Sequence, residues 1–196
     1  SPASDPAVQR IVSLQRATGY AVEEGKPPSQ LFWRIFHAYF EMISMTATGI
    51  VFILLFPFWF TLGHPNVTMH LCILMTFAQL FTSIIKDTVR IPRPASPPVV
   101  RIGASHYAAE MSFPSGHSSG ALLLAYVNAR YVNQYYYPND SESNMIVNLI
   151  GVGYFLQVAF SRVYLGMHTD IDVLAGSLVG LMLALAHGYL GLDAQL

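Results

Sequence analysis

Basic side chains are concentrated between Lys86 and Arg93 in a sequence of which only 11% is charged. Lys86 and Arg90 are four residues apart, a spacing that places both on one face of a helix. Pro92 and Pro94 flank Arg93, and prolines end a helix and redirect the chain. Arginine binds phosphate through two parallel hydrogen bonds, and lysine binds it as a point charge. The cluster therefore predicts an anion site, and the alternative is a basic collar at a membrane interface.

A second cluster, Pro114-Ser115-Gly116-His117, directly precedes an apolar stretch. Proline and serine are residues with which helices begin. The free N–H groups and the dipole of a helix N-terminus bind anions, and glycine lets an anion approach the backbone closely. His117 would lie on the first turn, within reach of such an anion. Taken alone, the cluster is explained more simply by an ordinary helix cap and an interfacial histidine.

The third cluster runs from Arg162 to His168 and Asp172. If a helix begins near His168, then His168 and Asp172 face the same way. A carboxylate on one imidazole nitrogen fixes the tautomer and leaves the other nitrogen nucleophilic. The alternatives are a polar loop and a metal site at His168, Asp170 and Asp172. We predict no metal, because no further acidic cluster accompanies these residues.

The composition indicates a polytopic membrane protein. Hydrophobic residues make up 53% of the chain and the mean hydropathy is +0.43. Charged residues make up only 11% of it, whereas about 25% of the residues in a soluble domain are charged. The formal net charge of −1 provides no basic field for nucleic acid, so no such partner is expected. The expected partners are the lipid bilayer and a membrane lipid substrate. The sequence does not indicate an oligomeric state.

Charge-free stretches predict about five to six membrane spans, because crossing the hydrocarbon core takes about 20 residues. No charged residue occurs from Met42 to Ile85, and a turn signal at 63–66 divides this run into expected helices over 38–62 and 67–86. Three further charge-free runs follow: Met111–Ala129, Ser143–Ser161 and Val173–Leu192. The predicted fold class is all-α, a polytopic membrane helical bundle. Alternate crossing places all three clusters on one side of the membrane.

The chain is expected to divide after residue 36. Residues 1–36 form a polar N-terminal segment, in which Val8, Ile11 and Val12 predict a short amphipathic helix lying on the membrane surface. Residues 37–196 form the expected transmembrane domain. The absence of an initiator Met suggests that the chain is trimmed from a longer one.

Together, the three clusters resemble the signature of the type-2 phosphatidic acid phosphatase superfamily. Its parts are Lys-x6-Arg-Pro, Pro-Ser-Gly-His and Ser-Arg-x5-His-x3-Asp, and all three occur here in that order. The resemblance covers about residues 37–190 and implies a haloperoxidase-like helical core. The stretch from Lys86 to Pro98, with Tyr164 and Gly166-Met167-His168, is most similar to the sphingosine 1-phosphate (long-chain-base phosphate) phosphatases. Gly116 departs from the threonine that those enzymes usually carry.

The resemblance implies metal-independent hydrolysis of a lipid phosphate monoester without a cofactor, most simply sphingosine 1-phosphate or dihydrosphingosine 1-phosphate. His168 is expected to attack phosphorus and form a phosphohistidine. Asp172 would orient it, and His117 would protonate the leaving alkoxide and then activate water. The expected phosphate-binding residues are Lys86, Arg93, Ser115, Gly116 and Arg162. Arg90 and Tyr164 are further candidates for headgroup contacts, with an interfacial charge and a packed aromatic ring as the alternatives.

Two other kinds of function stay open at this point. One is a phosphatase of phosphatidate or of polyprenyl diphosphate. The other is a non-catalytic lipid-binding membrane scaffold, which would need the cations but gives no reason for His117, His168 and Asp172 to occur together. The resemblance implies an integral protein of the endoplasmic reticulum whose active site faces the lumen, whereas the bias of cations toward that face predicts the cytosol.

Overall fold

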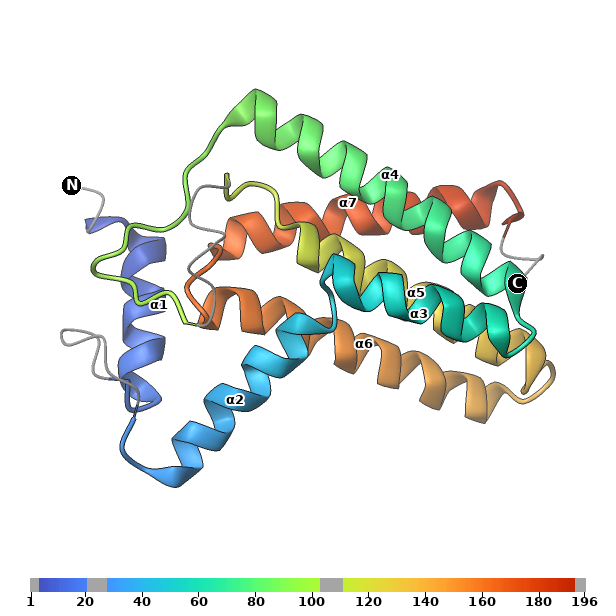
Figure 1. The fold of residues 1–196 in the computed structure, drawn as a ribbon, viewed down its shortest axis with the longest axis horizontal. Helices are drawn as coiled ribbons and strands as arrows, with labels where there is room; N and C mark the ends of the chain where they lie inside the picture. Colours follow the sequence, from blue (N-terminus) through green and yellow to red (C-terminus); the bar gives the residue numbers. More distant parts are fainter. Residues whose placement is uncertain (1–3, 21–27, 103–110, 193–196) are drawn as a thin grey trace.

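The computed structural model describes residues 4–20, 28–102 and 111–192, and every regular element in these ranges is a helix (Figure 1). The prediction of an all-α fold is confirmed. In chain order the helices are α1 (Pro6–Ala17), α2 (Leu31–Met45), α3 (Gly49–Thr61), α4 (Pro65–Val89), α5 (Gly116–Tyr135), α6 (Ser141–Tyr164) and α7 (Asp170–Tyr189). Helices α3 to α7 run along the long axis of the molecule, and α1 lies across it at one end.

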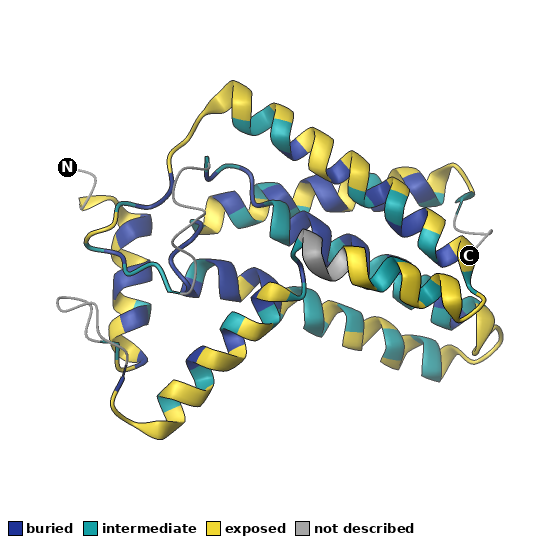
Figure 2. Cartoon of the chain, in the orientation of Figure 1, coloured by how far each residue is buried: buried dark blue, intermediate teal, exposed yellow. Residues whose placement is uncertain are grey.

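Helix α5 is the centre of the bundle and packs against α4, α6 and α7. Its residues Leu123 and Val127 are fully buried, together with Val67 and Leu71 of α4. Figure 2 shows that the outward faces of the surrounding helices stay exposed. Large apolar side chains occupy those faces, among them Leu149, Ile150, Leu178 and Leu185, as expected of a surface that contacts hydrocarbon.

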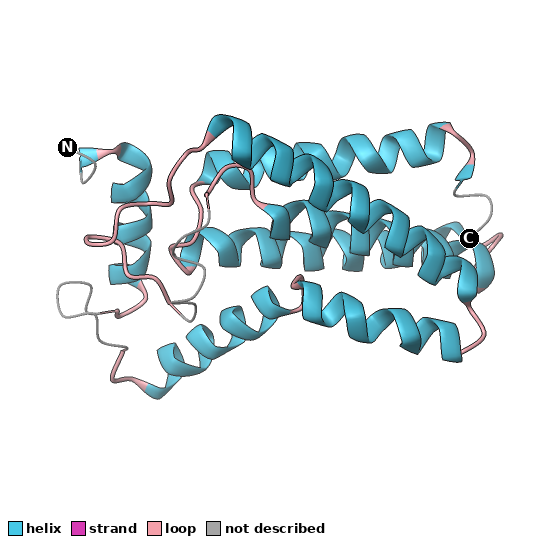
Figure 3. Ribbon diagram, turned by 45° about the horizontal axis from the view of Figure 1, so that its top comes forward, coloured by secondary structure: helices cyan, strands magenta, loops and turns pink. Residues whose placement is uncertain are grey.

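The single helix predicted over 38–62 is wrong, because the chain breaks into α2 and α3 (Figure 3). Two threonines at the break bond back to the preceding turn: the Thr46 hydroxyl donates to the carbonyl of Ile43 at 2.6 Å, and that of Thr48 to Met45 at 2.7 Å. Such bonds offer the backbone an alternative to the helix ladder. Hydropathy does not register this competition, so the break was not foreseen.

Three helices in the described part of the chain are long and apolar enough to cross a membrane: α4, α6 and α7. Helix α5 has the same length as α7 but carries Asn128, Arg130 and Asn133 toward its end. It also begins at Gly116, five residues later than the start of the predicted run at Met111. The figure of five to six spans therefore stays a prediction.

The N-terminal helix α1 packs against the protein through its apolar face. Val8, Ile11 and Val12 are buried in a cluster with Val99. Arg10 Nη2 lies 2.6 Å from Asp170 Oδ2, and this ion pair joins the polar face of α1 to the start of α7. The expected boundary after residue 36 falls inside α2. The division of the chain there, and the place of α1 at a membrane surface, stay predictions.

Buried Gln15 of α1 joins the loop after α4 to the last residue of α6. Its amide nitrogen donates to the carbonyls of Val100 at 2.7 Å and of Tyr164 at 3.2 Å, and its amide oxygen accepts from the Val100 N–H at 3.1 Å. Gly166, two residues after Tyr164, has a φ of 72°, and a Cβ at Gly166 would lie 2.5 Å from the Val99 side chain. The loop that leads to His168 is therefore held from the N-terminal side.

Helices α5 and α7 approach each other closely through small residues. A Cβ on Gly176 would lie 2.1 Å from the carbonyl oxygen of Ser115, and one on Gly180 would lie 2.8 Å from that of Ser119. Small residues spaced by four let helix backbones come together in membranes. The Ser115 N–H donates to the carbonyl of Asp172 at 2.9 Å, which fixes the beginnings of the two helices against each other.

Candidate active site

Four helix ends meet at one end of the bundle and bring the three sequence clusters together. Lys86 lies in the last turn of α4, His117 in the first turn of α5, and Arg162 in the last turn of α6. The first turn of α7 supplies Asp172. Beside these ends is a cavity of about 650 Å³, and five of the predicted residues line it: Lys86, Arg93, Gly116, His117 and His168. Ser115, Arg162 and Asp172 lie behind them and are buried.

His168 sits in the short loop before α7 and is 1% exposed. Its Nδ1 is 3.8 Å from Asp172 Oδ2, too far for a direct hydrogen bond. The hydroxyl of Ser112 lies between them, donating to Asp172 Oδ2 at 2.6 Å and lying 3.3 Å from His168 Nδ1. The direct contact between carboxylate and imidazole that the spacing predicted is therefore replaced by a relay through a serine.

The relay fixes the tautomer of His168. The Ser112 hydroxyl uses its one hydrogen in the bond to Asp172. Toward His168 the serine oxygen can therefore only accept a hydrogen bond from a ring N–H. The proton of neutral His168 then lies on Nδ1, and the lone pair lies on Nε2. This is the arrangement that a nucleophilic histidine needs.

The Asp172 carboxylate is itself held by the start of its helix. Thr169 and Asp172 form a reciprocal capping box, in which the Thr169 N–H donates to Asp172 Oδ2 at 2.8 Å and the Asp172 N–H donates to the Thr169 hydroxyl at 3.3 Å. Oδ2 therefore accepts from Thr169 and from Ser112. Asp172 is a positioning residue whose orientation is set locally.

His168 is neutral in this environment. Burial away from water lowers the pKa of His168 to about 4, and the cations Arg162 and Arg93 act in the same direction, while Asp172 opposes them. A lowered pKa keeps the imidazole unprotonated at neutral pH. An imidazole in this state can act as a nucleophile without a separate base.

The arginines are held by groups that the motifs do not specify. Arg93 Nη1 donates to the carbonyl of Met167 at 3.1 Å, next to His168. Arg162 Nη1 donates to the Ser44 hydroxyl at 2.5 Å, which ties the end of α2 to the site. Both arginines are buried, and their charges act on His117 together with that of Lys86. The site is strongly electropositive and suited to an anion with two charges.

Ser115 and the start of α5 have the geometry of an anion cradle, the role that the sequence predicts for them. Ser115 is the N-cap, and its hydroxyl oxygen accepts from the Ser118 N–H at 3.4 Å and from the Ser118 hydroxyl at 3.0 Å. The N–H groups of Gly116 and His117 belong to the first turn, which has no intrahelical carbonyl to bind. They lie at the cavity with the positive end of the helix dipole.

The structure does not place Arg90 and Tyr164 in the cavity. Arg90 is exposed, ends α4 in the left-handed conformation (φ 52°), and donates from Nε to the carbonyl of Asp87 at 2.9 Å. Tyr164 is fully buried, and its hydroxyl bonds to His37 Nδ1 at 2.6 Å and donates to Thr18 at 3.2 Å. Its ring packs among Phe36, Phe40 and Phe160, which is the packed aromatic of the alternative interpretation.

Two residues of the site were missed in the sequence. Ser112 and Ser44 are small polar residues, and the only signal for Ser112 was its place three residues before Ser115. Ser44 had no signal, because its role depends on the break between α2 and α3. Within the described ranges, no group of three or more His, Cys, Asp or Glu side chains could hold a metal ion.

The helical fold and the electropositive histidine site define a class of protein. Residues 67–191 match the PAP2 superfamily, and the chain belongs to it. Two solved structures share the fold. A transmembrane PAP2-type phosphatidylglycerolphosphate phosphatase from Bacillus subtilis aligns with a TM-score of 0.69 and 22% identity over 95% of this chain and 88% of that one. LpxE from Aquifex aeolicus aligns with a TM-score of 0.62 and 20% identity over 91% of this chain and 94% of that one.

Curated relatives narrow the comparison within the superfamily. Sphingosine-1-phosphate phosphatase 1 of Mus musculus is 34% identical over 91% of this chain and 40% of its own length. Dihydrosphingosine 1-phosphate phosphatase YSR3 of Saccharomyces cerevisiae is 30% identical over 72% of this chain and 35% of its own length. The chain thus spans about two fifths or less of the length of these relatives.

Proposed function

We propose that the chain hydrolyses a lipid phosphate monoester without a metal, with sphingosine 1-phosphate or dihydrosphingosine 1-phosphate as substrate. One observation carries the proposal: neutral His168, oriented through Ser112 and Asp172, faces a cavity that Lys86, Arg93 and His117 also line. The names of the curated relatives support the choice of lipid. The proposed phosphatase domain covers residues 37–196.

The reaction would proceed in two displacements. A phosphate monoanion that enters the site gives its proton to neutral His117. His168 Nε2 then forms a bond to phosphorus as the bond from phosphorus to the lipid oxygen breaks, and His117 passes this proton to that oxygen. This yields the free alcohol and a phosphohistidine. A water then attacks phosphorus and gives a proton to His117, and the bond to His168 breaks to release inorganic phosphate. Phosphoryl transfer depends mainly on charge stabilisation and alignment. Apart from the nucleophile, the largest contribution to the rate would therefore come from Lys86, Arg93 and Arg162.

The setting of the site supports a lipid rather than a soluble phosphate ester. The cavity continues from the phosphate-binding residues along α4, a helix apolar enough to span a membrane. We place the protein in the endoplasmic reticulum with the site facing the lumen, as its resemblance to sphingoid-base phosphatases implies. The cations of the site do not argue against this side, because phosphate binding explains them.

The test is phosphate release from sphingosine 1-phosphate by detergent-purified protein in excess EDTA, with phosphatidate measured in parallel. We expect turnover in EDTA that His168→Ala abolishes. The matched control is His64→Asn, since His64 lies at the opposite end of α4 and does not line the cavity. Faster hydrolysis of phosphatidate would refute the substrate. Lipid binding without turnover in the folded wild-type protein would favour the scaffold.

A further inference from the structure

One face of α4 carries a polar stripe into the cavity. Thr76, Gln79, Ser83 and Lys86 all line it, and their spacing of three or four residues places them on the same side of the helix. Lys86 belongs to the phosphate-binding residues. The other three lie progressively farther along a helix that is apolar enough to cross the membrane. Polar residues in such a helix are costly and mark a ligand path.

The polar groups of the stripe differ in whether the protein satisfies them. The Thr76 hydroxyl donates to the carbonyl of Cys72 at 2.7 Å, within its own helix. The side chains of Gln79 and Ser83 make no hydrogen bond to any residue in the described ranges. Gln79 is exposed and Ser83 is half-buried, so both polar groups are open to the cavity that they line. Gln79 is therefore set up to bind something that occupies the cavity.

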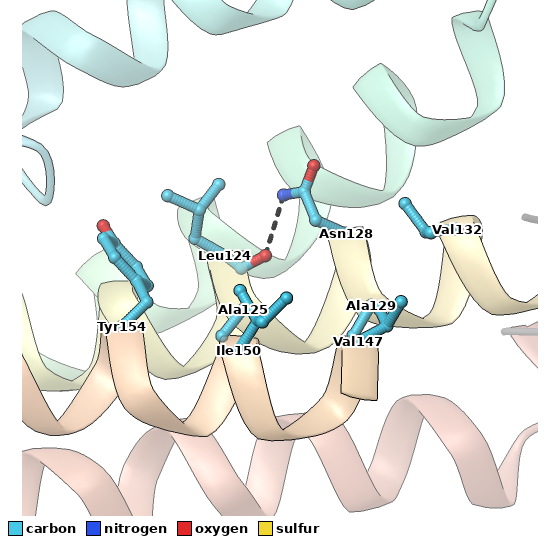
Figure 4. A pocket seen from close by; sticks show the side chains of 9 residues that line it. Leu124, Ala125, Asn128, Ala129, Val132, Val147, Ile150 and Tyr154 are labelled. Atoms are coloured by element: carbon cyan, nitrogen blue, oxygen red, sulfur yellow. Dashed lines mark hydrogen bonds between the residues drawn. The ribbon is translucent and has the colours of Figure 1, made fainter. Parts of the chain in front are cut away.

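A second pocket in the molecule shows the contrast. The pocket between α5 and α6, of about 310 Å³, is lined almost entirely by apolar side chains (Figure 4). Its one amide, Asn128, donates to the carbonyl of Leu124 at 2.8 Å, the dashed line in the figure. The amide of that pocket is bound through its nitrogen within its own helix, whereas the carboxamide of Gln79 makes no such bond.

The position of Gln79 is next to the phosphate cradle. An ideal Cβ on Gly116 would lie 3.9 Å from Gln79 Oε1, so the carboxamide borders the residues expected to hold phosphate. The cavity also has apolar lining residues, among them Ile53, Phe56 and Met75, and Met75 lies on α4 on the side of Gln79 away from Lys86. From Lys86 to Cys72 the helix rises about 21 Å, more than half of the roughly 30 Å hydrocarbon core.

We propose that Gln79, assisted by Ser83, binds the amino and hydroxyl groups that follow the phosphate in a sphingoid base. The hydrocarbon chain then lies along α4 toward Cys72. A carboxamide accepts from an ammonium or hydroxyl through its oxygen and donates to a hydroxyl through its nitrogen. The inference rests on the proposed function and makes Gln79 a residue that selects this lipid among phosphate monoesters.

The test compares sphingosine 1-phosphate with octadecyl phosphate, which has the chain and the phosphate but neither polar group. In Gln79→Leu, kcat/KM for sphingosine 1-phosphate should fall about 10-fold, the loss of one net hydrogen bond, while that for octadecyl phosphate stays unchanged. Ser83→Ala should show a smaller change in the same direction. Thr76→Val is the matched control and should leave the ratio unaltered. Equal losses for both lipids, or an unchanged ratio in Gln79→Leu, would overturn the proposal.

A binding measurement separates this inference from the proposed reaction. Cys72 is the single cysteine and lines the far part of the cavity, so its alkylation by a membrane-permeable maleimide reports occupancy. In the His168→Ala background, sphingosine 1-phosphate should protect Cys72 at about 10-fold lower concentration than octadecyl phosphate, and inorganic phosphate should not protect it. Gln79→Leu should remove the difference. Equal protection by both lipids refutes the role of Gln79, whereas selective protection without turnover in the wild type refutes only the reaction.

Discussion

Replacing Gly176 with alanine should force α5 and α7 apart where they hold the site together. A Cβ on Gly176 would lie 2.1 Å from the carbonyl oxygen of Ser115 and 2.9 Å from its carbonyl carbon. These are backbone atoms and cannot rotate away. Because favourable contacts between heavy atoms begin near about 3.5 Å, the helices must separate by more than about 1 Å.

The separation would act on both halves of the site, because the Ser115 N–H donates to the carbonyl of Asp172. A misplacement of about 1 Å costs on the order of 100-fold in rate. Overpacking destabilises by about 1–3 kcal/mol, whereas alanine favours a helix interior over glycine by about 1 kcal/mol. We therefore expect kcat/KM to fall about 100-fold with a modest drop in thermal midpoint.

Other glycines supply a graded series. Gly180→Ala, whose Cβ would lie 2.8 Å from the Ser119 carbonyl oxygen, should show an intermediate loss. Gly151→Ala would make an ordinary contact at 3.6 Å with Ala125. Gly153→Ala would meet no atom of the described residues within 4 Å and should be at least as stable as the wild type. Phosphate release and thermal unfolding in detergent measure both quantities for each variant.

Two results would refute this reasoning. Wild-type kcat/KM in Gly176→Ala would mean that the site does not depend on the close approach of α5 and α7. An equal loss in Gly153→Ala would mean that any added methyl group disturbs the bundle, irrespective of the contact that it makes.

Three further predictions concern His168, the proposed nucleophile, and the groups that support it. Ser112→Ala should lower kcat about 10- to 100-fold with little change in KM, since a hydrogen bond to a charged group is lost; Ser112→Thr, which keeps the hydroxyl, should recover most of the activity, and failure of that recovery would count against the relay. In nitrogen-15 NMR spectra of the ligand-free protein, His168 should stay neutral at physiological pH and protonate only as the pH falls through about 4; Arg93→Gln should raise that pKa because a cation favouring the neutral ring is removed, and titration near the ordinary value would contradict the burial argument. Gln15→Leu should leave the carbonyls of Val100 and Tyr164 without their partner and lower the free energy of unfolding by about 1–3 kcal/mol, measured by thermal unfolding; an unchanged midpoint would show that these hydrogen bonds are dispensable.

The helical class and the meeting of the motifs followed from sequence because each depends on a local or periodic property. Charge-free runs identify long apolar helices, and alternate crossing brings Lys86, His117 and His168 to the same end. The break at Thr46–Thr48 did not follow, because it depends on which hydroxyl binds which carbonyl. Ser112 was missed for a related reason: its function arises only where a separate segment passes between His168 and Asp172.

The N-terminal helix α1 is a second example of contacts that a sequence pattern does not predict. Its amphipathic pattern predicts one apolar face, but a pattern does not state what covers that face. In the structure Ile11 and Val12 pack with Val99 of a distant loop, and Gln15 adds a buried polar contact that amphipathicity alone would assign to solvent. Contacts between segments far apart in the chain decide such cases.

One oxygen atom of the capping box at the start of α7 has two structural roles. Asp172 Oδ2 both completes the first helical turn and receives the serine that orients His168. Neutralising this carboxylate would weaken the helix start at the moment that it removes the counter-charge of the imidazolium. Protonation of Asp172 in acid would therefore weaken the start of α7 and the support of His168 together, rather than affect one group alone.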